Sequence, residues 1–207
     1  MLPQEKIQHY TLEEYLELDH ASEEKLEFWD GNVFTLAGAS VNHNQIQVNL
    51  ISSLRSKLRG IGCRVFPSDM RVKVPEYPPY RYPDLSALCG EAEFESLGRQ
   101  ELLVNPSLIV EILSDSTAEF DRSYKFTYYK SIPSFTEYVL IAQDRAHVSQ
   151  FVKQGENEWL MREFNRLAAK IYLSSLDCEL QLTEIYEDVV FPETPPPFQQ
   201  IEQISAQ

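Results

Sequence analysis

Long apolar runs are missing from this chain of 207 residues. No stretch approaches the roughly 18 consecutive apolar residues of a membrane-spanning helix. Residues 1–5 lack the basic segment and following apolar segment of a signal peptide, so none is expected. With 43% hydrophobic and 24% charged residues, the composition is typical of a globular protein with a buried core. The length predicts a single domain over residues 1–190, followed by a proline-rich tail at 191–207.

Cysteine is nearly absent. The three cysteines, Cys63, Cys89 and Cys178, are odd in number and far apart. They give neither a disulfide framework nor the spacing of a zinc site. A reducing cytoplasm is therefore the compartment that we expect.

Basic residues are scarce, since 18 Lys and Arg stand against 32 Asp and Glu and give a net charge of −14. Phosphate contacts dominate the affinity of proteins for nucleic acids. The charge therefore argues against a broad basic surface that holds nucleic acid tightly. A local basic groove, or an enzyme whose metal ion offsets its own acids, stays open.

Glycine is also rare, and none of the seven glycines falls in a GxGxxG motif, so no phosphate-binding loop of that kind is expected. Ser114, Ser116 and Thr117 offer hydroxyl groups, but no Ser-His-Asp spacing accompanies them. Ser116 is explained as a helix cap with Glu119. The sequence also lacks a recognisable base-reading helix or zinc module.

What is present is an alternation of helical and strand patterns. We expect helices at 11–19, 40–59, 116–130 and 182–189, a hairpin at 25–36 around Asp30-Gly31, and strands at 63–66, 70–74, 82–88, 108–113, 136–142, 147–152, 158–164 and 171–173. The polar segment 90–101 is expected to be a loop. This order predicts an α/β (mixed α+β) fold, a central mixed sheet flanked by helices. The strand at 108–113, the next helix and the strand near 138–141 are expected to form a βαβ crossover.

Two carboxylates stand in unusual places. Asp84 begins an apolar run after Tyr82-Pro83, and Glu111 lies in the middle of the apolar strand at 108–113. A buried carboxylate needs a cation, either a metal ion or a basic side chain. If the strands are adjacent, the two acids suit Mg²⁺ or Mn²⁺, with the backbone carbonyl of Ile112 as a third ligand. Alternatively, Asp84 is a plain strand-end residue and Glu111 is paired in the core.

Lys125 is the candidate cation, because it follows the Glu111 strand on the next helix. Asp121 lies four residues before it, so the two side chains can pair on one helical face. The alternative is an exposed ion pair of little energetic consequence. His43 can equally be a surface or satisfied histidine, and Glu27 can simply face solvent. Three nearby aromatic residues are expected in the core and at its rim: Phe126, Tyr128 and Tyr129.

A set of short motifs occurs in a fixed order along about residues 8–175. The set comprises KLEFWDGNV from Lys25, His43, Tyr82-Pro83-Asp84, VEILSDST from Val110, Asp121, Lys125, Tyr129 and EYVL from Glu137. In this order and spacing the chain resembles the bacterial Uma2 family, whose members are assigned as restriction endonucleases of the PD-(D/E)XK nuclease superfamily. The resemblance implies a restriction-endonuclease-like core and a metal-dependent phosphodiesterase.

The resemblance also implies roles for individual residues. Asp84 would be the PD aspartate, Glu111 the second acid, and Glu27 an extra acid from the N-terminal part. The superfamily lysine is expected two residues after Glu111, where this chain has Leu113. In several branches the following helix supplies the lysine, and Lys125 matches that placement.

Three functions follow as hypotheses. The first is a Mg²⁺- or Mn²⁺-dependent DNA endonuclease with Asp84, Glu111 and Lys125 as catalytic residues and with Glu27, Asp121 and His43 in support. The second is a catalytically inactive binding or assembly module on the same fold. The third is a hydrolase of another phosphate ester. A homodimer is a further hypothesis, because cutting both strands of a duplex needs two sites.

Overall fold

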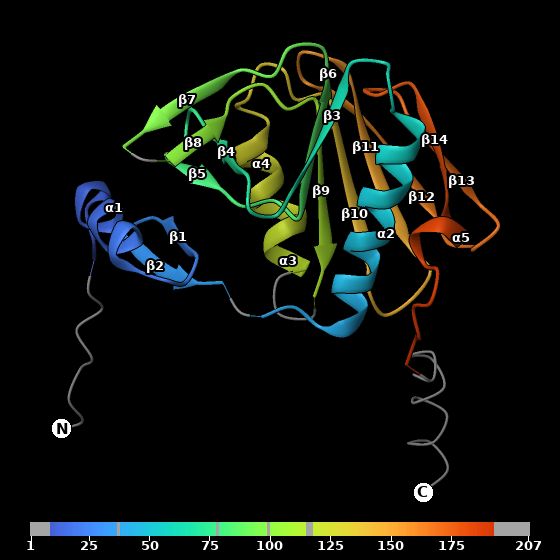
Figure 1. Ribbon diagram of the computed structural model, residues 1–207, viewed down its shortest axis with the longest axis horizontal. Coiled ribbons are helices and arrows are strands. Elements are labelled where there is room, and N and C mark those ends of the chain that lie inside the picture. Colours follow the sequence, from blue (N-terminus) through green and yellow to red (C-terminus); the bar gives the residue numbers. More distant parts are fainter. Residues whose placement is uncertain (1–8, 37, 78, 99, 115–117, 193–207) are drawn as a thin grey trace, which may run out of the picture.

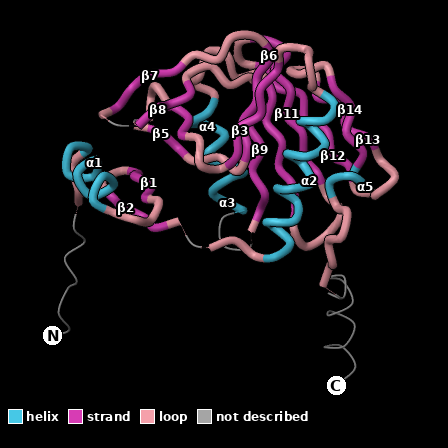
Figure 2. The backbone as a smooth tube through the Cα atoms, in the orientation of Figure 1, coloured by secondary structure: helices cyan, strands magenta, loops and turns pink. Residues whose placement is uncertain are grey.

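The protein is described from a computed structural model, which covers residues 9–36, 38–77, 79–98, 100–114 and 118–192 (Figures 1 and 2). A sheet of six strands runs through its centre in the order β12-β11-β10-β9-β6-β3. Strands β9 and β10 are parallel and the other neighbours are antiparallel. The expected mixed sheet and βαβ crossover are therefore confirmed. The strand bounds are β3 (Cys63–Pro67), β6 (Leu85–Cys89), β9 (Leu108–Leu113), β10 (Glu137–Ala142), β11 (Val148–Gly155) and β12 (Glu158–Phe164).

Helices cover both faces of this sheet (Figure 1). On one face lie α2 (Val41–Lys57), the hairpin of β13 (Lys170–Leu173) and β14 (Cys178–Gln181), and the short helix α5 (Leu182–Ile185). On the other lie α3 (Ala118–Phe120), the π-helix η1 (Asp121–Lys125) and α4 (Phe126–Tyr129). Both faces of β9 and β10 are buried, which explains why these strands are almost entirely apolar.

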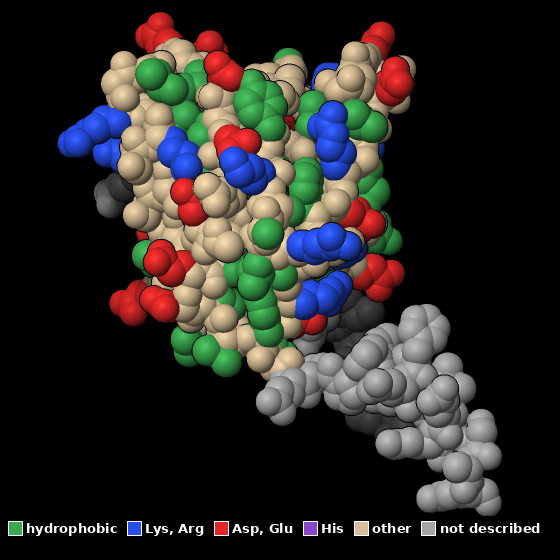
Figure 3. All heavy atoms as spheres, turned by 90° about the vertical axis from the view of Figure 1, so that its right-hand side faces the viewer, with side chains coloured by type: hydrophobic (Ala, Val, Ile, Leu, Met, Phe, Trp, Pro, Cys, Tyr) green, Lys and Arg blue, Asp and Glu red, His purple; other side chains and the backbone are tan. Residues whose placement is uncertain are grey.

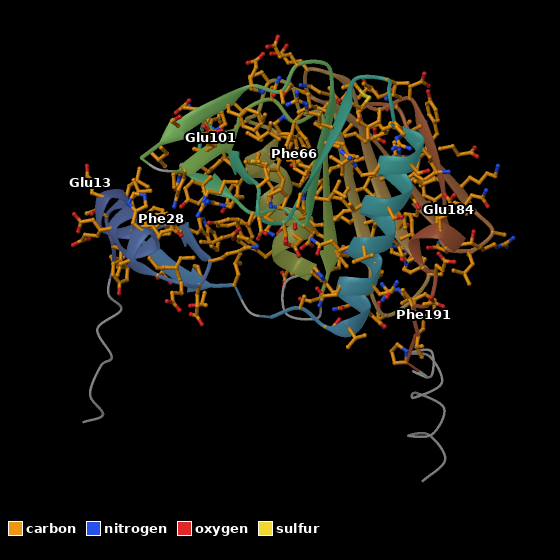
Figure 4. All side chains as sticks on the ribbon, in the orientation of Figure 1. Glu13, Phe28, Phe66, Glu101, Glu184 and Phe191 are labelled. Atoms are coloured by element: carbon orange, nitrogen blue, oxygen red, sulfur yellow. A yellow bond between two sulfur atoms is a disulfide. The ribbon has the colours of Figure 1, made fainter. Side chains whose placement is uncertain are left out.

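The N-terminal part sits beside a second, smaller sheet. This N-terminal part consists of α1 (Leu12–Ala21) and the hairpin of β1 (Leu26–Trp29) and β2 (Asn32–Thr35). The small sheet has the order β5-β4-β8-β7, with β5 (Tyr80–Arg81), β4 (Arg71–Lys73), β8 (Gln100–Leu103) and β7 (Phe94–Leu97). Phe28 lies on the N-terminal side of the molecule, and Phe66 lies where the two sheets meet (Figure 4).

The local signals at the N-terminus are confirmed. Thr11 and Glu14 form the expected capping box. Asp30 and Gly31 both have positive φ, 45° and 77°, as a two-residue hairpin turn requires. Asp19 of α1 then accepts hydrogen bonds from Tyr80 (2.5 Å) and Gln100 (2.7 Å), which attaches α1 to the small sheet.

Several expectations from the sequence are wrong. The polar segment 90–101 is a β-hairpin rather than a loop, because β8 pairs with β4 and buries Leu102 and Leu103. The helix expected at 116–130 is described only from Ala118, its centre is a π-helix, and the proposed cap Ser116 lies outside the described residues. The last helix ends at Ile185, and strand β14 precedes it. Most of the tail, residues 193–207, lies outside the described residues.

The expectation that the cysteines form no disulfide is also wrong. Cys63 and Cys89 are bonded to each other, and Cys178 is a buried free thiol. The antiparallel register of β3 and β6 sets these two residues opposite each other, which spacing along the chain could not reveal. None of the described helices combines the length and apolar character needed to cross a membrane.

Candidate active site

The sheet brings Asp84 and Glu111 together. Strands β6 and β9 are antiparallel with Leu85 opposite Val110, so Asp84, one residue before β6, stands beside Glu111. The Asp84 Oδ2 atom accepts a hydrogen bond of 2.7 Å from the backbone N–H of Ile112. This bond fixes the Asp84 carboxylate against the end of β9, as the expectation of adjacent strands required.

The carboxylate of Glu111 is buried and has two partners on the helix that follows. Its side chain is 2% exposed, and its Oε2 atom lies 3.1 Å from Nζ of Lys125. Its Oε1 atom accepts a hydrogen bond of 2.7 Å from the hydroxyl of Tyr129. Lys125 also lies 3.0 Å from Oδ1 of Asp121. The lysine therefore sits between two carboxylates and holds both.

The alternative of an exposed Asp121–Lys125 pair is wrong. Their side chains are only 3% and 10% exposed. Asp121, Lys125 and Tyr129 follow one another at intervals of four residues, so they share one face of the helical segment. The first two lie in the π-helix, whose backbone is fixed from the sheet by a hydrogen bond of 2.9 Å from the Tyr138 hydroxyl to the Asp121 carbonyl. Single-turn π segments are frequent at functional sites.

The first turns of α2 supply two further contacts to Asp84. The Nε2 atom of His43 lies 3.1 Å from Asp84 Oδ1, and Gln47 donates a hydrogen bond of 2.8 Å to the Asp84 carbonyl oxygen. Ser40 caps α2 through the backbone N–H of His43. The alternative of His43 as a plain surface histidine is wrong, since its side chain is 14% exposed.

Glu27 supports the site from a second layer. It is buried on β1, and its Oε1 atom accepts a hydrogen bond of 3.1 Å from the backbone N–H of Tyr82. The alternative in which Glu27 faces solvent is therefore wrong. The contact fixes the chain two residues before Asp84, and its charge is close enough to act on Lys125.

A cavity of about 560 Å³ opens at this end of the sheet. Its lining includes the acids Asp84, Glu111 and Asp121 together with Lys125, His43 and Ile112. Six of the seven sequence-predicted residues therefore share one cavity, and the seventh, Glu27, is not part of its lining. A cavity with converging polar groups is the usual form of a small-molecule or catalytic site.

The site carries more negative than positive charge. Burial raises the pKa of Glu111 well above its usual value; Lys125 acts in the opposite direction, while Asp121 and Asp84 add to the rise. Burial alone would lower the pKa of Lys125, but Glu111, Asp121, Glu27 and Asp84 outweigh it and hold the pKa well above its usual range. One lysine thus faces four carboxylates, an arrangement that favours an additional cation.

This donor set fits a hard divalent ion with few protein ligands. Among the residues that the structure describes, no group of three or more His, Cys, Asp or Glu side chains converges as a metal site. Mg²⁺ instead keeps several waters and takes one or two carboxylates plus phosphate oxygens. Asp84 and Glu111 are two carboxylates of that kind, and both line the cavity.

Two contacts escaped the sequence reasoning. Tyr129 was expected only as a core aromatic, yet its hydroxyl binds Glu111. Gln47 was not considered, yet it holds the backbone of Asp84. Each lies four residues after a residue that was singled out, Lys125 and His43 respectively, so the helical repeat was the signal that could have found them.

Comparison with known proteins assigns the chain to a family. Residues 12–184 match the family model Uma2, described as "Putative restriction endonuclease". Uncharacterized protein sll1609 of Synechocystis sp. is 38% identical over 164 residues, 79% of this chain and 92% of the relative. Uncharacterized protein slr1290 of the same organism is 28% identical over 179 residues, 86% of this chain and 92% of the relative.

A solved structure shows the same fold. It is a crystal structure described as "a putative nuclease belonging to DUF820" from Anabaena variabilis, with a TM-score of 0.69 and 19% identity. The match covers 87% of this chain and 99% of that chain. The chain therefore shares the α/β fold of that protein, a sheet with flanking helices, and it belongs to the Uma2 family.

Proposed function

We propose that this chain is a metal-dependent DNA endonuclease that hydrolyses phosphodiester bonds. One observation carries the proposal: Asp84 and Glu111 meet at the end of two adjacent strands with Lys125 within 3.1 Å of Glu111, in a shared cavity. Family membership supports nuclease activity in general. The metal, the DNA substrate and the residue roles are parts of the proposal.

Asp84 and Glu111 would hold Mg²⁺ or Mn²⁺ with the carbonyl oxygen of Ile112. Such an ion lowers the pKa of an attacking water and offsets charge on the phosphodiester. Lys125 would orient that water and offset the charge that develops on the phosphate. Asp121 keeps the lysine charged and directed, and Tyr129 fixes one oxygen of Glu111.

Lys125 is positioned to take the role of the superfamily lysine that residue 113 does not supply. Leu113 is buried in the apolar layer, where it packs with the helix side of the sheet. Lys125 approaches Glu111 from that same side. Its ammonium group therefore lies on the face of the sheet to which a lysine at position 113 would point.

A cleavage assay tests the proposal. Supercoiled plasmid is incubated with wild type, Glu111→Gln and Lys125→Met in the presence of Mg²⁺ or Mn²⁺. Glu111→Gln keeps the size of the side chain and an oxygen that can accept from Tyr129. Cleavage should fall at least a hundredfold in both variants, as is usual when an electrostatic catalytic group is removed.

The matched control is Glu179→Gln. Glu179 also pairs with a lysine, Lys170, at 2.8 Å, but that pair is exposed on the β13–β14 hairpin away from the cavity. Its cleavage rate should equal that of the wild type. Undiminished cleavage in both site variants would refute the assignment of the residues, and thermal melting shows whether each variant is folded.

One observation favours a second candidate, a catalytically inactive binding or assembly module. Both oxygens of Glu111 are already satisfied within the chain, by Lys125 and by Tyr129. A buried ion pair can serve structure alone. Calorimetry with Mn²⁺ separates the candidates: heat of binding that disappears in Glu111→Gln supports the nuclease, and no heat with wild type supports the module.

We also propose the cytoplasm as the compartment, because an enzyme that cuts cellular DNA must reach it there. Glutathione and thioredoxin keep most thiols reduced in that compartment. The bond between Cys63 and Cys89 would therefore be open in the cell and closed after exposure to oxygen. Thiol counting on protein purified under a reducing and an oxidising atmosphere checks this.

A further inference from the structure

Strand β12 forms one edge of the six-stranded sheet and is unusually exposed. It hydrogen-bonds to β11 on one side, and within the described ranges no strand pairs with its other side. Leu160 and Met161, which point to opposite faces, are 40% and 47% exposed. Hydrophobic side chains lie among charges of both signs on this side of the molecule (Figure 3). An edge strand of this kind is a template for pairing with another chain.

The sequence of β12 is complementary to itself in one antiparallel register. If Leu160 lies opposite Leu160 of a second copy, Glu158 comes opposite Arg162 and Arg162 opposite Glu158. On the other face, Trp159 comes opposite Met161 and Met161 opposite Trp159. Opposite-charge pairs are among the cross-strand pairs that stabilise antiparallel strands, and an aromatic ring can pack on the apolar side chain opposite it.

The faces of β12 allow these pairs to form. In β12, Leu160 and Arg162 point to the same side of the sheet, the side of α2. Their partners on β11 are Val152 and Gln150, which alternate with the same face as Val148 in the core under α2. Trp159 and Met161 point to the side of α4, where Trp159 already packs on Phe126. Each face of the strand thus presents its own complementary set.

Charges on an edge strand usually prevent pairing rather than promote it. In β12, Glu158 and Arg162 stand two residues before and two residues after Leu160. In the register centred on Leu160, each therefore faces the opposite charge of the second copy. Shifting the centre to Met161 instead sets Glu158 opposite Phe164 and Trp159 opposite Glu163. The charges therefore select a single pairing and disfavour its neighbours.

Strand β3, at the other edge of the same sheet, is not self-complementary in this way. Strand β3 has five residues, ends at Pro67, and carries the disulfide to β6 at Cys63. Proline cannot donate a hydrogen bond to an added strand, so it protects an edge. Around its centre, Val65, the sequence sets Arg64 opposite Phe66 and offers no charge pair.

We propose that β12 is the interface of a symmetric homodimer, in which the β12 strands of two copies pair antiparallel about Leu160 and join the two sheets into one. A twofold axis is the commonest symmetry of soluble oligomers, and it demands such a self-complementary surface. The interface is independent of the chemistry at Asp84 and Glu111, so it stands or falls separately from the nuclease proposal.

Light scattering after size exclusion tests the interface on the full chain. The wild type should have twice the monomer mass of 24.0 kDa. Glu158→Arg and Arg162→Glu each set like charges opposite one another twice and should weaken the dimer at least about tenfold. The double variant with both changes restores opposite charges and should return to the dimer. Glu179→Arg, a charge reversal on exposed β14, is the matched control and should stay dimeric.

Cysteine cross-linking tests the register. Leu160→Cys sets two thiols opposite each other and should give a covalent dimer after mild oxidation, whereas Met161→Cys should not. The wild type, treated in parallel, accounts for the native cysteines. A wild type that stays monomeric at about 100 μM, a double variant that fails to recover, or cross-linking of Met161→Cys alone would overturn the proposal.

Discussion

Replacing Lys125 by methionine removes the one lysine charge that Glu111 and Asp121 share and keeps a side chain of similar length. The two carboxylates, 2% and 3% exposed, are then left without a cation. Removing one partner of a buried ion pair costs about 3–5 kcal/mol. In a domain of this size each kcal/mol lowers the melting temperature by about 2–4 °C. The expected fall in melting temperature is therefore about 6–20 °C.

The loss of stability should depend on pH in a defined direction. Burial raises the pKa of Glu111 and Lys125 opposes that rise, so in the variant the pKa rises further. The folded state then binds the proton more tightly than the unfolded state does. The cost of the substitution is therefore smallest where Glu111 is protonated in both folded proteins, and it grows as the pH rises above the folded-state pKa of Glu111 in the wild type. Destabilisation should be larger at about pH 8 than at about pH 5.

Urea denaturation and thermal melting measure both effects. The variant Lys125→Met is compared with Lys170→Met, which removes an exposed lysine from its pair with Glu179 and should melt like the wild type. The double variant Lys125→Met/Glu111→Gln should recover part of the loss, because it removes both charges of one pair. A loss below about 1 kcal/mol, or one that is equal at both pH values, would refute the argument that these charges are buried and coupled.

Three further predictions concern contacts outside the ion pair. Tyr129→Phe removes the hydroxyl that donates to Glu111 and should cost about 1.5–3 kcal/mol in urea denaturation, whereas no loss would mean that the carboxylate finds another donor. Cys63→Ser should cost about 2–4 kcal/mol, and reductant should destabilise the wild type equally while leaving the variant unchanged; a reductant effect on the variant would contradict this. Glu137→Gln should cost about 1–3 kcal/mol by thermal melting. The Glu137 Oε2 atom accepts hydrogen bonds from the backbone N–H and the hydroxyl of Ser175, and its Oε1 atom accepts one from Gln150. In the variant, either orientation of the glutamine amide places its NH2 group against one of these donors. An unchanged melting temperature would mean that no such clash forms.

The sequence determined the central elements because their signals are local. The apolar, β-branched run at 108–113 predicted a strand covered on both faces, and the glutamate inside it required a partner once it was buried. Asp30-Gly31 and the capping box at Thr11 were equally decisive, because turn and cap preferences depend on a few adjacent residues. The position of Lys125 after this strand identified it as a candidate partner for Glu111.

Elements held by distant partners were not readable in this way. The segment 90–101 is polar and looks like a loop, but strand β4 gives β8 a hydrogen-bonding neighbour and the core buries Leu102 and Leu103. The final helix ends at Ile185 rather than at residue 189, and the next residue, Tyr186, instead donates a hydrogen bond from its hydroxyl to the carbonyl oxygen of Ala142 on β10. In each case the energy comes from contacts across the chain, which local preference does not contain.

The candidate site divides along the same line. The sequence identified the acids by their unusual places in apolar runs, and the lysine by its place after the strand that holds Glu111. Only the tertiary structure decided that the Asp121–Lys125 pair is buried, that Tyr129 and Gln47 serve the two acids, and that Cys63 meets Cys89. The physical reason is that burial and strand register are properties of the packed sheet, and a side chain's charge matters only once its solvent and its neighbours are known.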